Sequence, residues 1–327
     1  MSKLHICLTT NKKWVRFAQR AVYDIIIRKH PETEIAFYVL VDDMEGVPDG
    51  FKKFGTIDCI DITFERISAM KEFDGNIKVS KDWLGPFKHL KFLIPELDIF
   101  KDVKRVLYLD VDMLARRDLT DLYNTDLDGY PLGCVKNYMK LISKNFIYQN
   151  DKKFRFESGL ILMDLPKLRE LHFTELCKSV SSICDNDHIL LDTVGMYMTK
   201  ELDPKAHIPY HFISTGNTIF NDISNWNILC NTKYKSIQDL VDRSYLWHFA
   251  GDKEKCEQGM PLVQACFNIS ERRLTEFLDT GVVMPWKKED DDALYMYKGV
   301  IPIPEIQTES DKEKEIIETK EIAEPAH

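Results

Sequence analysis

Two aspartates follow an apolar run in the segment VLYLDVDML, residues 106–114. The run before Asp110 is typical of a buried strand, and side chains two residues apart on a strand face the same side. We therefore expect Asp110 and Asp112 to project together from the carboxyl end of this strand, the edge where open α/β sheets bind ligands. Two neighbouring carboxylates repel each other, and each raises the pKa of the other. A divalent cation that prefers oxygen ligands, Mg²⁺ or Mn²⁺, would remove this repulsion and could also bind the diphosphate of a nucleotide.

The Asp-x-Asp spacing is weak evidence when taken alone, because it occurs four times in the chain. The pair at 126/128 lies in NTDLDGYP, which is typical of a turn, and the pair at 290/292 begins an acidic stretch. A solvated acidic turn is the ordinary explanation for such pairs. Only the pair at 110/112 directly follows an apolar strand, so only this pair is a metal-site candidate.

The elements around the aspartates predict an α/β fold. KLHICLTT and EIAFYVLVDD are strand-like, and WVRFAQRAVYDIIIRKHP between them has apolar residues at helical spacing. Strand–helix–strand is the unit of a parallel sheet covered by helices. Two further strands are predicted at VKRVLYLDVDML and GLILMDL, and two helices at FKHLKFLIPELDIF, broken at Pro95, and DNDHILLDTVGMYM.

Composition and charge narrow the class of protein. The 327 residues are 44% hydrophobic and 30% charged, which suits a globular protein with a sizeable core. The net charge of −9 is concentrated in residues 287–327, which hold twelve Asp/Glu and six Lys, so the nearly neutral body gives no case for nucleic-acid binding. We expect a folded domain over 1–286 and an acidic, flexible tail over 287–327, most clearly from residue 300.

The apolar runs, the N-terminal residues and the cysteines indicate where in the cell the protein is located. No apolar run is long enough to predict a membrane span, and the N-terminal residues lack the pattern of a signal peptide. The eight cysteines are scattered without a CxxC pair, which favours a reducing, cytoplasmic location. The oligomeric state stays open, with a homodimer as one alternative.

Four ordered segments carry a resemblance to a known family. The segment FKHLKFLIPELDIFKDVKRVLYLDVDMLARRDLTDLYNTDL resembles the core of the retaining glycosyltransferases of family 8, the glycogenin-like and bacterial lipooligosaccharide galactosyltransferase-like enzymes. LTTN at 8–11, FESGLILMDL at 156–165 and HFAGDKEK at 248–255 resemble further blocks in the same order. The resemblance covers about residues 3–256. It implies a GT-A fold, Rossmann-like with a mixed, mostly parallel central sheet flanked by helices, that binds a UDP-sugar and Mn²⁺.

The resemblance implies three metal ligands, Asp110, Asp112 and His248. Neutral imidazole is a common ligand for ions such as Mn²⁺. Without the family context, His248 between Trp247 and Phe249 would be interpreted as a packed histidine.

The resemblance also implies a nucleotide site at the end of the first strand. Its expected residues are Leu8, Thr9, Thr10 and Asn11, with Val111 between the two aspartates. Trp14 occupies the place of an aromatic residue near the uracil, where stacking contributes roughly 1–3 kcal/mol. The alternative for Trp14 is a core tryptophan on the first helix.

The chain departs from the family at positions that contact the donor. The basic residue expected near the start of the core segment is represented by His89, preceded by Lys88, and either could reach the diphosphate or the sugar. Glu157 replaces the first amide of the Asn-Ala-Gly block, and a carboxylate can only accept hydrogen bonds, so recognition of the sugar must differ. In the Asp-Gln block Asn186 and Asp187 occupy the two positions, although a shift of one residue would select Asp185.

The last block departs as well. The family lysine three residues after Gly251 is Glu254 here, with Lys253 and Lys255 on either side. One of these lysines is expected to meet the β-phosphate, and a solvated charged loop is the alternative.

The resemblance implies retention of configuration by a front-face route, in which the acceptor attacks on the side that the phosphate leaves. Asp187, under the donor sugar, and Glu157, near the anomeric carbon, are the catalytic candidates, and a double displacement through a carboxylate stays open. The expected reaction moves a hexose, glucose or galactose, from a UDP-sugar to a glycan or protein-linked hydroxyl. Candidate acceptor contacts in segment 205–245 are Tyr210, His211, Asn217 and Trp226.

Two rival functions remain. A metal-dependent nucleotidyltransferase of similar fold would carry a Gly-rich loop near the N-terminus, and LTTNKKW lacks one. A non-catalytic nucleotide-sugar or glycan-binding protein would keep the fold and the metal ligands but catalyse no transfer.

Overall fold

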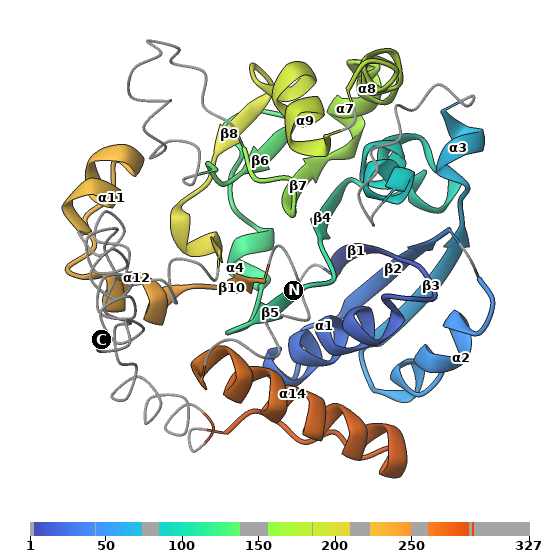
Figure 1. The fold of residues 1–327 in the computed structure, drawn as a ribbon, viewed down its shortest axis with the longest axis vertical. Coiled ribbons are helices and arrows are strands. Elements are labelled where there is room, and N and C mark those ends of the chain that lie inside the picture. Colours follow the sequence, from blue (N-terminus) through green and yellow to red (C-terminus); the bar gives the residue numbers. More distant parts are fainter. Residues whose placement is uncertain are drawn as a thin grey trace, which may run out of the picture.

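A computed structural model describes residues 3–42, 44–73, 85–137, 156–184, 186–209, 223–249, 261–287 and 290. In these ranges two sheets are packed between helices (Figure 1). The strands are β1 (Leu4–Thr10), β2 (Ile35–Val41), β3 (Ile60–Arg66), β4 (Arg105–Leu109), β5 (Met113–Ala115), β6 (Leu132–Cys134), β7 (Leu160–Asp164), β8 (Thr199–Glu201), β9 (His207–Pro209) and β10 (Leu246–His248). The α-helices are α1 (Val15–Arg28), α2 (Val47–Phe51), α3 (Ala69–Glu72), α4 (Thr120–Tyr123), α7 (Leu165–Glu170), α8 (Phe173–Ser181), α9 (Asp187–Gly195), α11 (Ile223–Cys230), α12 (Ile237–Arg243) and α14 (Pro261–Thr280). The described residues also form four 3-10 helices: η1 (Phe54–Thr56), η2 (Gly85–Glu96), η3 (Asp98–Phe100) and η4 (Pro204–Ala206).

The larger sheet has the strand order β3-β2-β1-β4-β7-β6-β8. The pairs β1–β2, β2–β3, β1–β4 and β6–β8 are parallel, and β7 runs antiparallel to both β4 and β6. The predicted α/β class with a mixed, mostly parallel sheet is therefore confirmed. The edge strand β3 was not among the predicted strands, although the alternation of apolar and polar residues in IDITFER is typical of a half-exposed strand.

The predicted strand VKRVLYLDVDML is in fact two strands in two sheets. β4 ends at Leu109, and β5 joins the small sheet β5-β10-β9. Asp110, Val111 and Asp112 form the turn between them. The expectation that the two aspartates project from one strand is therefore wrong, because the chain leaves one sheet and joins the other between them.

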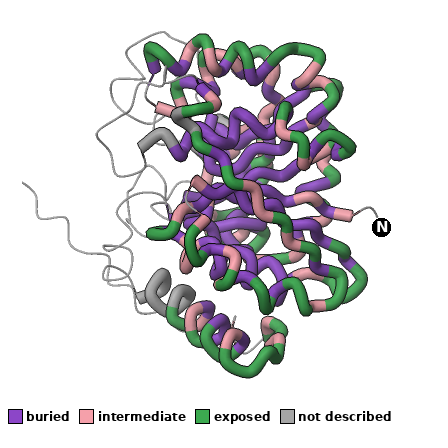
Figure 2. The backbone as a smooth tube through the Cα atoms, turned by 90° about the vertical axis from the view of Figure 1, so that its right-hand side faces the viewer, coloured by how far each residue is buried: buried purple, intermediate pink, exposed green. Residues whose placement is uncertain are grey.

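The helices cover both faces of the larger sheet. In Figure 2 the buried stretches of the backbone gather in the middle, and the exposed stretches lie on the outer sides. Helix α1 buries most of its length in the core and contacts β5 and α14. The predicted helix FKHLKFLIPELDIF lies instead in η2 and η3, with Pro95 inside η2.

The chain after α14 returns to α1. The Trp286 ring packs against two guanidinium groups, with its centroid 3.5 Å from Cζ of Arg28 and 5.1 Å from Cζ of Arg273. Asp290 pairs with Arg273, so the packed body reaches at least four residues beyond the predicted boundary at 286. Apart from residues 287 and 290, the predicted tail lies outside the described residues.

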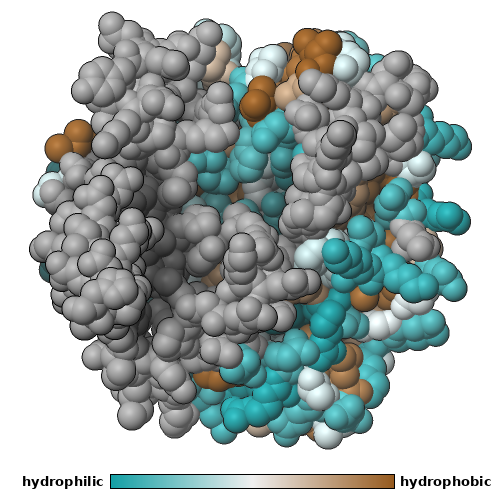
Figure 3. All heavy atoms as spheres, in the orientation of Figure 1, coloured by the Kyte–Doolittle hydropathy of each residue, from teal (hydrophilic) through white to brown (hydrophobic). Residues whose placement is uncertain are grey.

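Among the coloured side chains of Figure 3, teal ones cover the region of α1 and α14, and a few brown ones gather near α8 and α9. Among the described helices, none combines the length and the apolar character needed to cross a bilayer.

Candidate functional site

The candidate site lies where the two sheets meet. The register of β1 with β4 pairs Leu8 with Leu109, so the ends of these parallel strands lie together. On the other side of β4 the backbone N–H of Asp110 donates to the carbonyl of Gly159 at 2.8 Å. The N–H of Phe249, which follows β10, donates to the carbonyl of Asp112 at 3.0 Å. Backbone hydrogen bonds therefore fix both aspartates and bring the end of β10 to them.

These constraints bring together the three predicted metal ligands. Nε2 of His248 lies 3.2 Å from Oδ1 of Asp112 and 3.9 Å from Oδ2 of Asp110. One ligand atom from each residue lies within 4.8 Å of the other two. Asp112 and His248 are buried and Asp110 is partly open to solvent. Two carboxylates and one imidazole that converge in this way are suitable ligands for a divalent cation such as Mn²⁺.

Gly159 makes room for this cluster. A Cβ at this position would lie 2.8 Å from Cε1 of His248 and 3.0 Å from Oδ2 of Asp110. Both distances are shorter than ordinary van der Waals contact, so any side chain at 159 would displace two of the three ligands.

The electrostatics of His248 depend on its acidic neighbours. Burial alone would lower the pKa of His248, but Asp112 and Asp110 raise it above its ordinary value. The His207 ring lies beside it, with ring centroids 4.8 Å apart, and burial and the charge of His248 lower the pKa of His207 well below its ordinary value. Neither ring nitrogen of His207 has a hydrogen-bond partner among the described residues. The two carboxylates thus favour the protonated form of His248, and a cation bound by the three side chains would compete with that proton.

A buried lysine that was not predicted connects the metal ligands to Asp187. Nζ of Lys91 lies 2.9 Å from Oδ2 of Asp187 and 3.4 Å from Oδ1 of Asp110, and it donates to the carbonyl of Ser158 at 3.0 Å. Burial would raise the pKa of Asp187, but Lys91 holds it well below its ordinary range. The hydroxyl of Ser158 also donates to Oδ2 of Asp187 at 2.5 Å.

The predicted basic contacts must be revised accordingly. His89 is fully buried, and its ring packs with Phe73 and Phe92, so it is part of the core. Lys88 is buried in the same helix, whereas Lys91 is the lysine that reaches Asp110 and Asp187. The sequence did contain a signal for Lys91: a lysine inside the apolar run LKFLI is expected to be buried and therefore paired.

The predicted nucleotide residues lie at the end of β1. Leu8, Thr9 and Thr10 are buried, Val111 is buried in the turn after β4, and Oδ1 of Asn11 accepts a hydrogen bond from the N–H of Trp14 at 3.1 Å. Trp14 belongs to the hydrophobic core, is 8% exposed and packs against Phe17 with ring centroids 5.1 Å apart. This packing favours the core alternative, because little of the ring is left for a base to stack upon.

The start of helix α9 positions Asp187 and contacts Glu157, which lies in the segment before β7. The Asn186 side chain caps the helix by accepting from the N–H of Ile189 at 3.1 Å, so the first turn places Asp187 toward Lys91. Glu157 is buried, with Oε2 3.8 Å from Nδ1 of His188. Glu157 and Asp187 therefore lie near the metal ligands, on two segments that α9 ties together.

Among the remaining predicted acceptor and donor contacts, one lies in the core and the others lie outside the described residues. Trp226 is buried in the core cluster. Gly251, Lys253, Lys255, Tyr210, His211, Asn217 and Asp185 lie outside the described residues.

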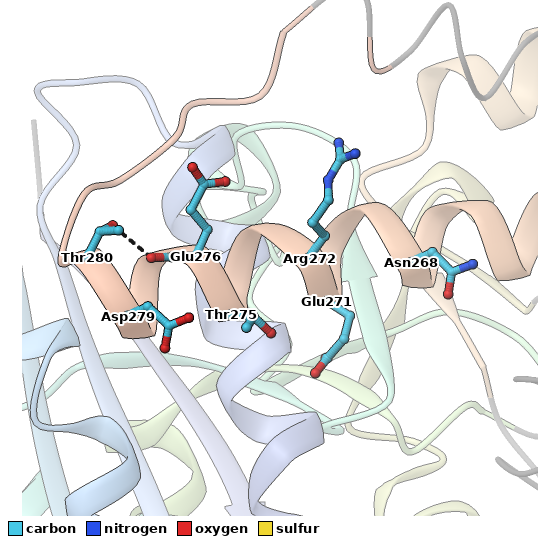
Figure 4. A pocket seen from close by; sticks show the side chains of 7 residues that line it. All are labelled: Asn268, Glu271, Arg272, Thr275, Glu276, Asp279 and Thr280. Carbon is cyan, nitrogen blue, oxygen red and sulfur yellow. Dashed lines mark hydrogen bonds between the residues drawn. The ribbon is translucent and has the colours of Figure 1, made fainter.

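A surface groove elsewhere is a poor candidate for the site. It measures about 420 Å³ and is lined by α14 alone, whose side chains spread along the outside of the helix (Figure 4). The lining residues are Asn268, Glu271, Arg272, Thr275, Glu276, Asp279 and Thr280. A single helix face offers no converging set of ligands like the cluster at His248.

The sequence matches the model of a known protein family. The family model Glycosyl transferase family 8 matches residues 5–256, which include all three candidate metal ligands. The chain belongs to glycosyltransferase family 8. This membership confirms the resemblance that the sequence blocks predicted.

Individual relatives of this family 8 chain are distant. Glycosyltransferase GlyF of Streptococcus pneumoniae is 28% identical over 138 residues, which cover 42% of this chain and 31% of GlyF. Probable galacturonosyltransferase-like 8 of Arabidopsis thaliana is 20% identical over 193 residues, 53% of this chain and 48% of the relative. The chain thus spans about half or less of the length of these curated relatives.

Solved structures show the same fold. An active-site mutant of LgtC superimposes with a TM-score of 0.62 at 18% identity, covering 88% of this chain and 98% of LgtC. The galactosyltransferase LgtC in complex with donor and acceptor sugar analogues gives a TM-score of 0.59 at 20% identity, with 88% and 99% covered. The predicted GT-A architecture is therefore confirmed.

Proposed function

We propose that this chain is a metal-dependent, retaining glycosyltransferase that moves a hexose from a UDP-sugar to a hydroxyl of a glycan or protein-linked acceptor. The observation that carries the proposal is the convergence of Asp110, Asp112 and His248 beside the ends of β1 and β4. In open α/β sheets this edge is where nucleotides bind.

The proposed cofactor is Mn²⁺ or Mg²⁺. When bound, such a cation neutralises charge that develops on a departing diphosphate. The side chains of Asp110, Asp112 and His248 would hold it, and Thr9, Thr10, Asn11 and Val111 remain the proposed contacts of the nucleotide. Lys253 and Lys255, with Gly251, remain proposed contacts of the β-phosphate.

The environment of Asp187 argues for a positioning role. Its carboxylate binds Lys91 and Ser158, and the pKa of Asp187 is well below its ordinary value, so it is a weak base. A weak base suits the front-face route, in which the leaving phosphate oxygen takes the acceptor proton and no strong enzymic base is needed. We therefore propose that Lys91 and Asp187 orient the donor sugar, and that Glu157 contacts it in place of the amide of the family pattern.

The hexose is proposed as glucose or galactose. LgtC is described as a galactosyltransferase, which supports a hexose donor for this chain. The scattered cysteines of the sequence support an intracellular place of action.

The test is turnover with a panel of UDP-sugars, each with Mn²⁺ and again with EDTA, measured as UDP release. We expect turnover with one UDP-sugar whose hexose is uncharged, and we expect this turnover to depend on the metal. NMR of the product should show that the anomeric configuration is retained. Asp112→Asn should abolish the metal dependence together with turnover.

Two results would contradict the proposal. Tight UDP binding without turnover, tested with sugar acceptors present, would indicate a non-catalytic binding protein. Undiminished turnover in EDTA would exclude the metal-dependent reaction.

A further inference from the structure

A buried tyrosine donates a hydrogen bond to one of the candidate metal ligands. Tyr108, two residues before Asp110, is fully buried in β4, and its hydroxyl donates to Oδ1 of Asp110 at 2.6 Å. Oγ1 of Thr9 lies 3.0 Å from the same phenolic oxygen. Because the phenol donates its proton to the carboxylate, Thr9 is the donor in this second bond.

The two oxygens of Asp110 therefore have different surroundings. Oδ1 faces inward, to the Tyr108 hydroxyl and to Nζ of Lys91 at 3.4 Å. Oδ2 faces the cluster, 3.9 Å from Nε2 of His248 and 3.0 Å from the place that a Cβ on residue 159 would occupy. The inward bonds decide which oxygen is presented to an ion.

We propose that Tyr108 is a positioning residue that fixes the Asp110 carboxylate with Oδ2 toward the cation and ties it, through Thr9, to the end of β1. The proposal rests on the proposed cation site.

Physical reasons support a role for the hydroxyl itself. The Asp110 side chain is 29% exposed and follows the last residue of β4, so backbone pairing and packing alone leave its carboxylate free to rotate. A bond of 2.6 Å from a fully buried phenol removes that freedom. Groups that orient a metal ligand in this way typically contribute 10–100-fold to metal affinity.

The hydrogen bond between Thr9 and Tyr108 also connects Asp110 to the neighbouring strand. Thr9 belongs to β1, whose end is the proposed nucleotide site, whereas Asp110 belongs to the turn after β4. Tyr108 thus joins the metal ligand to the neighbouring strand by side-chain bonds, in addition to the backbone pairing of β1 with β4. A ligand anchored to two strands loses less entropy when the cation binds.

The experiment measures Mn²⁺ affinity directly, without nucleotide or turnover, from the EPR signal of free Mn²⁺. Tyr108→Phe keeps the ring and removes the hydroxyl, and we expect its Mn²⁺ affinity to fall by about 10-fold or more. Tyr123→Phe is the matched control, because Tyr123 is also buried and its hydroxyl donates at 2.8 Å, but to the backbone carbonyl of Arg105. The control should keep wild-type Mn²⁺ affinity even if its melting temperature falls.

The outcomes separate this inference from the proposed function. If the wild-type protein binds Mn²⁺ and Tyr108→Phe binds it within about 2-fold as tightly, the positioning role is refuted although the cation site stands. If the wild-type protein binds no Mn²⁺, the cation site itself is refuted.

A second variant keeps the test decisive if Tyr108→Phe does not fold. Thr9→Val removes only the hydrogen bond from Thr9 to Tyr108, and its Mn²⁺ affinity should fall by roughly 2- to 10-fold, the worth of one neutral hydrogen bond. Wild-type affinity in Thr9→Val would overturn the proposed tie to β1.

Discussion

Replacing Lys91 with methionine should remove one of the few positive charges buried at the site. The Lys91 side chain is 1% exposed, and its partners Asp187 and Asp110 are 13% and 29% exposed. Methionine has nearly the same length but leaves Asp187 buried without its cation. Removing one partner of a buried ion pair typically costs about 3–5 kcal/mol of the free energy of unfolding.

The effect can be separated from lost packing by a double-mutant cycle. Asp187→Asn removes the stranded charge, so the double variant with Lys91→Met should be more stable than the sum of the single effects predicts. The expected coupling energy is roughly 1–3 kcal/mol. Urea unfolding gives these free energies, and thermal unfolding should show Lys91→Met melting on the order of 10 °C below the wild type.

Arg28→Met is the matched control for turnover. Arg28 and Asp24 form an ion pair on α1 whose side chains are 2% and 0% exposed, so breaking it should cost similar stability. Lys91→Met should lower kcat by about 100-fold, because Asp187 and the donor would lose their alignment, whereas Arg28→Met should keep kcat near the wild-type value. Additive free energies in the cycle, or equal kcat losses in both variants, would refute the reasoning.

Three further predictions follow from the same cluster. Gly159→Ala should lower Mn²⁺ affinity by about 10-fold or more without changing the circular dichroism spectrum. Gly55→Ala is the control, because a Cβ there meets open space, and it should leave the affinity unchanged. Equal Mn²⁺ affinities of the two variants would contradict the close approach at Gly159. Because Asp112 raises the pKa of His248 above its ordinary 6.5, calorimetry should show that Mn²⁺ binding weakens as the pH falls through the raised pKa. The stability that protonated His248 gives the metal-free protein is fully present below pH 6.5 and is lost as the pH rises through the folded pKa. A flat pH profile would contradict both expectations. The lowered pKa of Asp187 contributes stability above its ordinary 3.8 that is lost as the pH falls through the folded value, so Asp187→Asn should flatten the acid limb of the unfolding curve.

The convergence of the metal ligands could be anticipated, but its local geometry could not. The apolar run and the spacing of Asp110 and Asp112 pointed to the sheet edge, and only the ordered family blocks connected them to His248. The division of the segment into β4 and β5 was missed, because both halves are apolar and the change of sheet depends on pairing with β7 and β10.

Two predictions about single side chains, at His89 and Trp14, differ from the structure. His89 was predicted as the basic contact, but its ring packs beside Phe92, whereas Lys91, two residues further along the same helix, reaches Asp187. Trp14 fits a nucleotide site by position, yet burial against Phe17 places it in the core. Sequence shows residue types and spacing, whereas the direction of a side chain is decided by packing against distant segments.

The most direct test of the central claim is anomalous diffraction from crystals grown with Mn²⁺ and UDP. The account predicts one strong manganese peak in contact with Asp110, Asp112 and His248, with the diphosphate of UDP on its open side. A UDP molecule bound elsewhere, or bound at this edge with no manganese between the three side chains, would contradict it.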